Sequence, residues 1–366
     1  MTPAEKFIAA TILHKGPITF RDFMELALYH PQVGYYATGK GRIGKEGDYY
    51  TSSSLGPLFG RVLARQLAQM LEILGKGVLV EMGGGQGHLA KDVLEELKSL
   101  GKDVPYFIVE RSPAFREIQK EQLKGFNVRW ANSLEDLNPV DGVFFSNELV
   151  DAFPVHVVEM TEEGLKEVLV DWRAGEFREI LAPPTTPELE AYFRELGVEL
   201  PPGFRTEVNL DALDWLRTLS SRLRRGFVIT IDYGYPSHEL YQDYRSRGTL
   251  MAYYRHQAEE DPYVRVGEQD LTSHVNFSAL VHWGKKWGLE LTGFTDQAHF
   301  LLGLGILDLL SEEGGTLGLK ERLAAKTLLL PGGMGDTFKV LIQHKGLEPP
   351  PLKGLEDAPK SELFSL

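Results

Sequence analysis

The chain has 366 residues, 43% of them hydrophobic and 25% charged, which indicates a globular protein long enough for one elaborated domain or two. The lack of cysteine excludes disulfides, thiolate metal sites and cysteine nucleophiles, and the ten histidines lack metal-ligand spacing, so no metal is expected. A net charge of −13 argues against a nucleic-acid partner and suits a cationic one. No apolar run approaches the ~20 residues of a membrane span, and residues 1–10 lack the apolar core of a signal segment. No membrane insertion is therefore expected, and a cytoplasmic location is predicted.

Helices and strands alternate through the first half of the chain. Apolar residues at helical spacing predict helices over residues 7–13, 20–28 and 55–74, and Thr19 is placed to cap the second of them. Beyond these, strands are predicted at residues 78–82, 106–109, 128–130 and 143–146, with helices at residues 89–100 and 114–123. This alternation predicts an α/β fold with a doubly wound parallel sheet and right-handed crossovers.

A glycine- and tyrosine-rich loop, residues 34–51, separates the N-terminal helices from this alternation. Loops of this length without a regular pattern are usually functional or disordered, and the tyrosines argue against disorder. Its glycines permit hinge motion, and its tyrosines can exclude water from a site. We therefore expect a lid that closes over a bound cofactor or substrate, with Tyr36, Asp48 and Thr51 as its contact residues.

The stretch after the strand at residues 78–82 is rich in glycine and leads into a helix. Strand, glycine turn and helix together bring a ligand close to bare backbone amides at a helix N-terminus. The spacing Glu81-x-Gly83-x-Gly85-x-Gly87 is that of the first motif of class I methyltransferases, which bind S-adenosylmethionine. The dinucleotide pattern instead needs a small residue where His88 stands. A nucleotide-like ligand is favoured over a merely tight turn.

The ends of the next two strands offer further cofactor contacts. Glu110 ends the second strand, where a carboxylate can accept hydrogen bonds from ribose hydroxyls; the alternative is a cap for the helix near Ser112. Because adenosylmethionine and NAD both contain this ribose, the presence of Glu110 does not indicate which of the two cofactors is bound. Asn132 and Ser133 follow the third strand, where reading the adenine and capping a helix are equally good interpretations.

Polar residues follow the fourth and fifth strands, where the carboxyl ends of central strands line the active crevice. Asn147 is assigned to the cofactor, and Glu148 and Asp151 are predicted to be catalytic rather than parts of a capped surface helix. Asp232 ends the next strand and is predicted to contact the substrate or the lid. His274 precedes a helix and is a candidate helper, although a lone histidine there is more often structural.

The pattern changes after residue 154. Short turns at residues 163–164 and 174–175 join three predicted strands into a β-meander inserted in the α/β core. Further along, we expect a linker with a helix at residues 188–196, a helix at 210–223, a strand at 227–232, an irregular segment at 233–272, a helix at 277–287, and strands at 289–295 and 337–343.

The expected organisation has five parts. They are an N-terminal helical cap with the aromatic loop (1–54), the first part of the core (55–154), the inserted β-meander and linker (155–205), the rest of the core with a second insertion near 233–276 (206–345), and a C-terminal tail (346–366).

Several blocks in order along almost the whole chain resemble the MidA-like family of class I S-adenosylmethionine-dependent methyltransferases. These proteins are known in mitochondria as protein arginine methyltransferases required for assembly of respiratory complex I. The matching blocks are residues 34–36, 47–51, 56–60, 81–87, 147–154, 231–234 and 248–277. The sequence departs from the family pattern at Gly84, at Ser53-Ser54 and at Leu149-Val150, but it keeps the carboxylates and the required glycines.

The resemblance implies a Rossmann-like sheet of order 3-2-1-4-5-7-6, with residues 337–343 as the antiparallel seventh strand. It implies S-adenosyl-L-methionine as cofactor, S-adenosyl-L-homocysteine as product, and a protein partner with an exposed arginine; a homodimer is left open. A guanidinium is always charged, so Glu148 and Asp151 could grip it and concentrate electron density on the attacking nitrogen, with His274 as a helper. Two alternatives remain: a non-catalytic cofactor-binding assembly factor and an NAD-dependent oxidoreductase.

Overall fold

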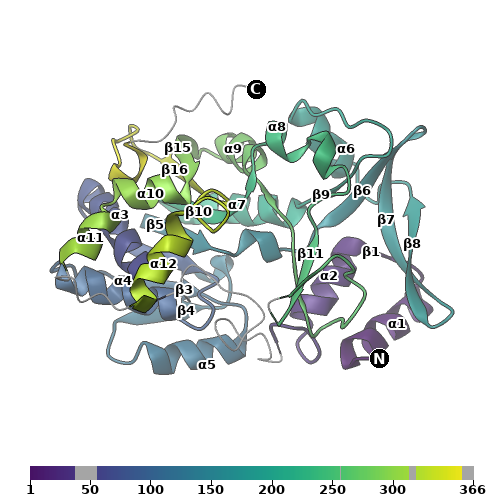
Figure 1. The fold of residues 1–366 in the computed structure, drawn as a ribbon, viewed down its shortest axis with the longest axis horizontal. Coiled ribbons are helices and arrows are strands. Elements are labelled where there is room, and N and C mark those ends of the chain that lie inside the picture. The colour runs from purple at the N-terminus through teal and green to yellow at the C-terminus, as the bar shows by residue number, and fades with distance from the viewer. Residues whose placement is uncertain (38–55, 256, 313–318, 357–366) are drawn as a thin grey trace.

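The computed structural model describes residues 1–37, 56–255, 257–312 and 319–356 (Figure 1). Its larger sheet has the order β15-β16-β10-β5-β2-β3-β4, in which β16 is antiparallel to both neighbours and the other pairs are parallel. Numbered along the chain, this order is 3-2-1-4-5-7-6, which is the order that the resemblance implies. The strands are β2 (Val78–Met82), β3 (Tyr106–Val109), β4 (Val128–Ala131), β5 (Val140–Asn147), β10 (Leu223–Tyr235), β15 (Glu290–Asp296) and β16 (Phe338–Lys345).

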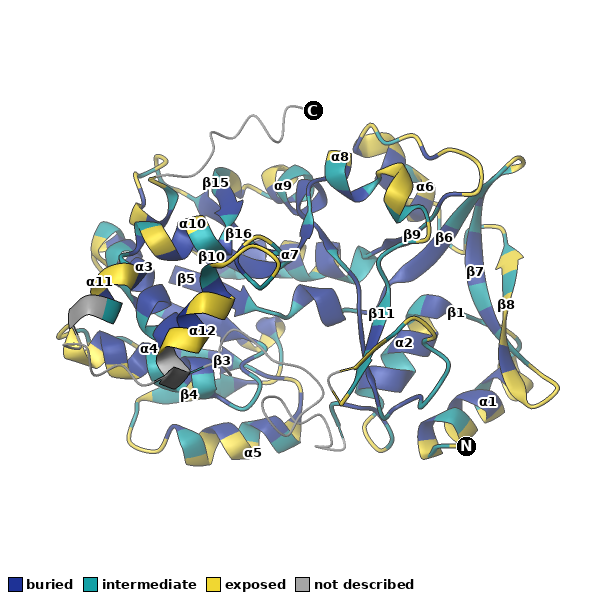
Figure 2. Cartoon of the chain, viewed as in Figure 1, coloured by how far each residue is buried: buried dark blue, intermediate teal, exposed yellow. Residues whose placement is uncertain are grey.

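Helices cover both faces of this sheet because its central strands are apolar on both sides. On one face, Leu79, Val143 and Phe145 pack against α3 (Leu58–Leu74) and α4 (His88–Ser99). On the other face, Val80 and Phe144 pack against α7 (Leu210–Arg222) and α9 (Phe277–Lys286). Three further helices, α10 (Gln297–Gly303), α11 (Ile306–Glu312) and α12 (Leu319–Leu329), add buried residues to the apolar cluster of the first face, and α5 (Pro113–Gln122) lies between β3 and β4 in the chain. Figure 2 shows the buried residues gathered along the strands and on the inner sides of these helices.

A second sheet holds the inserted β-meander, at the right of Figure 1. Its order is β1-β7-β6-β9, with β8 on the other side of β7. Its strands are β1 (Ile18–Thr19), β6 (His156–Thr161), β7 (Gly164–Arg173), β8 (Glu176–Ala182) and β9 (Arg205–Val208). The sequence predicts the three meander strands and α6 (Glu188–Glu195), whereas β1 and β9 are not predicted because they are only two and four residues long.

The N-terminal helices α1 (Pro3–Lys15) and α2 (Phe20–Tyr29) pack against the meander. Phe20, Phe23 and Leu28 share an apolar cluster with Val168 and Val170 of β7. The predicted cap of α2 is present, since the Thr19 side chain accepts a hydrogen bond from the Asp22 nitrogen. The N-terminal segment is therefore fixed to the insertion and not only to the α/β core.

The segment predicted to be irregular contains a small third sheet of order β12-β11-β13. Its strands are β11 (Met251–Tyr254), β12 (Gln257–Glu259) and β13 (Asp270–Thr272), preceded by α8 (Ser237–Leu240); the short strand β14 (Val275–Asn276) extends the edge of β10. The helices α10 to α12 between β15 and β16 were also not predicted. In the tail, Leu352 is buried and Gly354 donates its backbone hydrogen bond to Gln66 Oε1 at 3.0 Å. No described helix is long and apolar enough to cross a membrane.

Candidate functional site

The glycine loop between β2 and α4 has the open backbone that its sequence predicts. Gly83, Gly85 and Gly87 have positive φ angles of 70°, 51° and 87°. The Gly83 nitrogen donates to the Val109 carbonyl at 3.0 Å, which ties the loop to β3. A Cβ atom at Gly83 would lie 2.6 Å from Leu149 Cδ1, so both its φ and its neighbour require glycine. The loop thus presents bare backbone amides at the start of α4.

Two buried carboxylates flank this loop. Glu81 accepts a hydrogen bond from the Tyr106 hydroxyl at 2.7 Å, and burial raises the pKa of Glu81 to about 7. Glu110 accepts one from the Ser112 nitrogen at 2.8 Å, and burial raises its pKa as well. The cap of α5 is Ser112, whose side chain accepts a hydrogen bond from the Phe115 nitrogen, and Glu110 only binds the backbone of this cap residue. This contact does not exclude ribose binding, because Glu110 also lines the cleft described next.

A cleft opens in front of the loop. It consists of two adjoining cavities of about 360 and 570 Å³, and we call them together the glycine-loop cleft. Five residues line both cavities: Tyr29, Gly83, Glu110, Arg111 and Leu149. The Arg111 guanidinium lies 4.8 Å from the centre of the Tyr29 ring and pairs with Glu25. Neither Tyr29 nor Arg111 is marked by a motif in the sequence, so both were missed.

Asn132 and Ser133 lie in the wall of the smaller cavity. Their backbone nitrogens donate to Asp136 Oδ2 at 3.0 and 3.2 Å, and Ser133 is the N-cap of a short turn. The two interpretations of these residues, reading of the adenine and capping of a helix, are therefore both compatible with the structure. Trp215 of α7 contributes a large aromatic surface to the same wall.

The segment after β5 is wrapped around the carboxylate of Asp232. Asp232 is fully buried, and its Oδ2 accepts hydrogen bonds from the backbone nitrogens of Leu149, Val150 and Asp151 at 3.2, 2.9 and 3.3 Å. Its Oδ1 accepts one from the Tyr233 nitrogen at 3.0 Å. The predicted substrate or lid contact of Asp232 does not fit this placement, because both carboxylate oxygens bind backbone inside the protein.

Glu148 is held in a backbone conformation that is rare for its residue type. Its φ of 53° lies in the left-handed region, and its nitrogen donates to the Ile231 carbonyl at 2.9 Å. Its Oε1 accepts a hydrogen bond from Asn147 Nδ2 at 3.0 Å. Asn147 itself is not among the residues that line the glycine-loop cleft, and the contact that the structure shows for its side chain orients Glu148.

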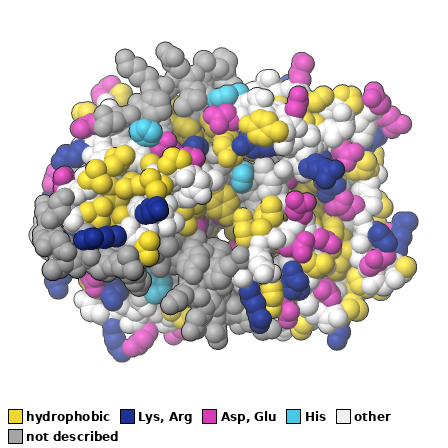
Figure 3. Space-filling view, viewed as in Figure 1, with side chains coloured by type: hydrophobic (Ala, Val, Ile, Leu, Met, Phe, Trp, Pro, Cys, Tyr) yellow, Lys and Arg dark blue, Asp and Glu magenta, His cyan; other side chains and the backbone are white. Residues whose placement is uncertain are grey.

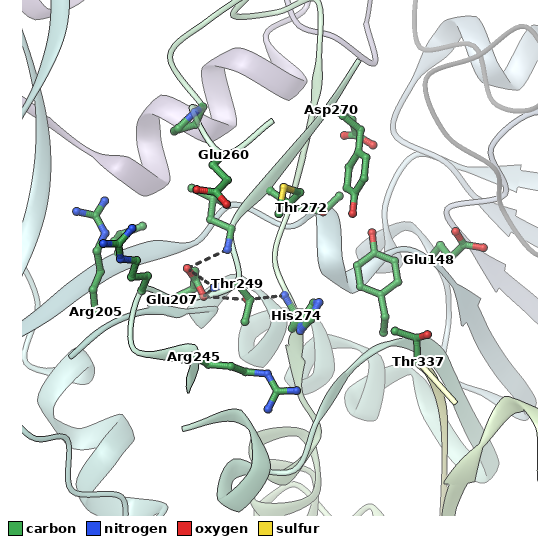
Figure 4. A pocket seen from close by; sticks show the side chains of 18 of the residues that line it. Glu148, Arg205, Glu207, Arg245, Thr249, Glu260, Asp270, Thr272, His274 and Thr337 are labelled. Atoms are coloured by element: carbon green, nitrogen blue, oxygen red, sulfur yellow. Dashed lines mark hydrogen bonds between the residues drawn. The ribbon is translucent and has the colours of Figure 1, made fainter. Parts of the chain in front are cut away.

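Glu148 also lines a second cavity of about 1030 Å³, which we call the large pocket (Figure 4). Because Glu148 lines this pocket and the glycine-loop cleft, the two spaces meet at its side chain. The charged residues of the pocket wall are Glu148, Glu179, Glu207, Glu260, Asp270, Arg205, Arg245 and Arg247. Figure 3 shows part of this hollow at the centre of the molecule.

Asp151 does not line the large pocket and is only 4% exposed. Burial raises the pKa of Asp151 to about 6, and a hydrogen bond from the Tyr233 side chain offsets part of this rise. Tyr233 does line the pocket. The two carboxylates predicted to act as a pair are therefore unequal, since Glu148 is accessible and Asp151 can act only through Tyr233.

His274 lies in the wall of the large pocket, where a residue that assists Glu148 and Asp151 is expected. Its Nδ1 is buried and has no hydrogen-bond partner among the described residues. Burial, followed by the positive charge of Arg245, lowers the pKa of His274 to about 4. The imidazole is therefore neutral at pH 7 and does not repel a cation.

The expected lid is only partly visible, because Asp48 and Thr51 lie outside the described residues. Tyr36 lines the glycine-loop cleft, and its hydroxyl donates to Asp270 Oδ1 at 2.7 Å. Asp270 in turn lines the large pocket and was missed from the sequence. Tyr36 thus joins the two spaces from the N-terminal side.

Comparisons with known proteins bear on this arrangement. A profile of a family of S-adenosyl-L-methionine-dependent methyltransferases matches residues 62–295, which is more than half of the chain. The chain belongs to this methyltransferase family. A crystal structure of a COG1565 superfamily member from Burkholderia thailandensis, bound to S-adenosyl-homocysteine, is 36% identical, with a TM-score of 0.91 over 98% of this chain and 95% of that one.

Two curated relatives of the methyltransferase, from rat and human, are each 28% identical to it. The rat and human proteins are both named "Protein arginine methyltransferase NDUFAF7, mitochondrial". Each matches 95% of this chain, with 86% of the rat protein and 85% of the human protein covered. These names contradict the predicted cytoplasmic location, which rested only on composition and the lack of a recognisable leader.

The cofactor of the methyltransferase is S-adenosyl-L-methionine, and the site fits it. Gly83 and Gly85 line the cleft without a side chain, so a ligand can approach the backbone there. Glu110 offers a carboxylate at the end of β3, where a ribose can be bound. The NAD-dependent alternative is thereby set aside. Among the described residues no cluster could hold a metal ion.

Proposed function

We propose that this methyltransferase methylates an arginine side chain of a protein partner in the large pocket. The observation that carries the proposal is the position of Glu148 at the junction of the glycine-loop cleft and the large pocket. A target nitrogen held by Glu148 from the pocket side would face the cofactor side directly. When bound, S-adenosyl-L-methionine supplies a methyl group attached to a positively charged sulfur.

The contact residues of the cofactor are part of the proposal. Gly83, Gly85 and Gly87 present the backbone, Glu110 binds the ribose, and Asn132 and Ser133 line the adenine end. Glu81 acts indirectly, since its carboxylate binds Tyr106 rather than lining the cleft.

The chemistry of arginine favours this set of side chains. A guanidinium keeps its charge at all physiological pH values, so its receptor must be anionic and must polarise one nitrogen. Glu148 supplies the accessible carboxylate, while the neutral His274 adds no opposing charge. Asp151, behind Tyr233, can take up the proton that the guanidinium releases, because burial raises the pKa of Asp151 to about 6.

The relatives support arginine as the target, since the rat and human proteins are named as protein arginine methyltransferases. The family resemblance of the sequence adds a respiratory complex I subunit, or a similar protein, as the partner. The size of the large pocket, about 1030 Å³, suits a side chain together with part of its peptide.

Mass spectrometry of methylarginine in cells with and without this protein tests the proposal. We expect a small set of methylated arginines that disappear in the deletion strain and return with the wild-type chain but not with Glu148→Gln. Return of those sites with Glu148→Gln would contradict the proposed role of the carboxylate. A deletion that impairs assembly of the partner without altering any methylarginine would favour the non-catalytic assembly factor.

A further inference from the structure

The large pocket has a basic wall that the proposed grip on arginine does not use. Three arginines line it: Arg205, Arg245 and Arg247. Arg205 is neutralised inside the protein, because its two terminal nitrogens donate to both oxygens of Glu179 at 2.6 Å. Arg245 and Arg247 form no ion pair with any carboxylate among the described residues. Two uncompensated cations in one pocket stand out in a chain of net charge −13.

Arg245 is held in place although it lacks an anionic partner. Its guanidinium lies 3.9 Å from the centre of the Tyr235 ring and 4.7 Å from that of Tyr244. Its Nη1 donates to the Tyr244 hydroxyl at 2.8 Å and to the carbonyl of Glu239 at 2.5 Å. Stacking and neutral acceptors fix the side chain without cancelling its charge, which leaves a preorganised cation.

The positive charge of Arg245 affects another residue of the pocket wall, His274. It is the second cause, after burial, of the lowered pKa of His274, which lies in the same wall. Figure 4 shows the Arg245 side chain extending past His274, on the opposite side of the pocket from Glu148 and Asp270. The cation of Arg245 therefore lies apart from the carboxylates of Glu148 and Asp270.

Other anions do not account for this wall. Glu207 and Glu260 also line the pocket, but neither forms an ion pair with Arg245 or Arg247 among the described residues; the Glu207 carboxylate instead accepts hydrogen bonds from the backbone nitrogens of Thr249 and Leu250 and from the Thr249 hydroxyl, at 3.0–3.2 Å. The cofactor carboxylate is not the counterion either, because neither Arg245 nor Arg247 lines the glycine-loop cleft. An anionic group from outside the protein is what the wall lacks.

We infer that Arg245 and Arg247 bind an acidic side chain of the partner protein close in sequence to the methylated arginine. The inference rests on the proposed function and adds a specificity rule to it. The substrate would carry opposite charges on neighbouring residues, its arginine facing Glu148 and its carboxylate facing the two arginines. Arg can bind a carboxylate through two parallel hydrogen bonds, which would fix the peptide direction in the pocket.

The test is methylation of a protein extract with isotope-labelled S-adenosylmethionine, followed by mapping of labelled arginines. Four enzymes are compared: wild type, Arg247→Glu, Arg247→Lys and the control Lys124→Glu. Arg247 is exposed, so its replacement should not impair folding. Lys124 is exposed just beyond the end of α5 and lines none of the pockets described above, and Lys124→Glu alters the net charge as much as Arg247→Glu does.

We expect wild type, Arg247→Lys and Lys124→Glu to methylate arginines that have Asp or Glu within a few positions. Arg247→Glu should lose this preference and favour sites with a neighbouring Lys. For peptides copied from the strongest sites, exchange of the acid for its amide should raise the wild-type KM about fivefold, with kcat unchanged.

Two results would overturn the inference in different ways. Labelled arginines whose neighbours match the background composition, or a preference that Arg247→Glu leaves unchanged, would refute the acidic-residue rule alone. If the wild type labels no arginine, the proposed function fails, and the rule fails with it.

Discussion

Asp232 Oδ2 lies 2.9 Å from the backbone nitrogen of Val150 and accepts its hydrogen bond. The same oxygen serves the two neighbouring nitrogens, so one buried carboxylate shapes the turn that follows Glu148. We therefore expect Asp232 to act as a positioning residue for the turn after Glu148, even though the sequence alone placed it in the crevice.

Removal of this acceptor should destabilise the protein. Asp232→Ala removes the carboxylate that accepts hydrogen bonds from four backbone N–H groups, those of Val150 and Asp151 buried and those of Leu149 and Tyr233 partly buried, and we expect a loss of about 2–5 kcal/mol in the free energy of unfolding. Asp232→Asn keeps a side-chain oxygen that can accept hydrogen bonds, so its free energy of unfolding should fall clearly less. Urea unfolding of both variants measures the difference, and equal stability of the two would show that these hydrogen bonds contribute little.

Loss of the Glu148 charge should affect catalysis rather than cofactor binding. Glu148→Gln keeps the shape of the side chain, and we expect turnover to fall at least ~100-fold with nearly unchanged affinity for S-adenosylhomocysteine. Glu260 is an exposed carboxylate in the wall of the same pocket, so Glu260→Gln is the matched control. We expect its turnover to fall much less than that of Glu148→Gln. Steady-state kinetics measure turnover, and calorimetry measures the affinity for S-adenosylhomocysteine. Turnover near the wild-type value in Glu148→Gln would show that another residue of the pocket performs the proposed role of Glu148.

The glycine loop offers a test with an internal control. Gly83 and Gly101 both have φ of 70°, so alanine is equally strained at either position. A Cβ at Gly83 would meet Leu149 at 2.6 Å, whereas a Cβ at Gly101 would have no atom within 4 Å. Calorimetry with S-adenosylhomocysteine should therefore show weakened binding for Gly83→Ala only. Equal affinities of the two variants would place the cofactor away from Gly83.

Activity and stability should respond to pH in opposite directions around Asp151. Burial raises the pKa of Asp151 from 3.8 to about 6 in the folded state, so the fold favours the protonated form. The contribution of this group to folding stability is therefore present at low pH and is lost as the pH rises from about 4 through about 6. If ionised Asp151 accepts the proton, kcat/KM should rise through the upper part of that window. The rise should be missing in Asp151→Asn, and a variant that retains it would assign it to another group.

The sequence predicts the α/β core well because its signals are local. The apolar strands, the glycine loop and the capped helices each depend on residues close together in the chain, and the structure has them within a few residues of the predicted bounds. The prediction of a β-meander is likewise confirmed, since turn residues such as Gly175, with φ of 86°, mark its hairpins.

The site was predicted less completely because its geometry depends on distant contacts. Glu148 and Asp151 are three positions apart, yet one faces the pocket and the other is buried, which no spacing rule reveals. Asp270 and Tyr36 meet although 234 positions separate them. The basic wall lies in a segment whose richness in Tyr, Arg and Gly was visible, but whose short strands give too weak a pattern to place Arg245.

The pairing of β1 with β7 has a consequence for synthesis of the chain. Ile18 and Thr19 find their partners only at Val170 and Leu169, and the apolar faces of α1 and α2 are covered by residues from as far along as Leu271. Residues 1–30 therefore have no completed core until the chain has been made as far as these partners, in contrast to a segment that folds as soon as it is synthesised. Nascent or truncated chains that stop before the meander would expose these two helices, which makes them natural targets for chaperones and proteases.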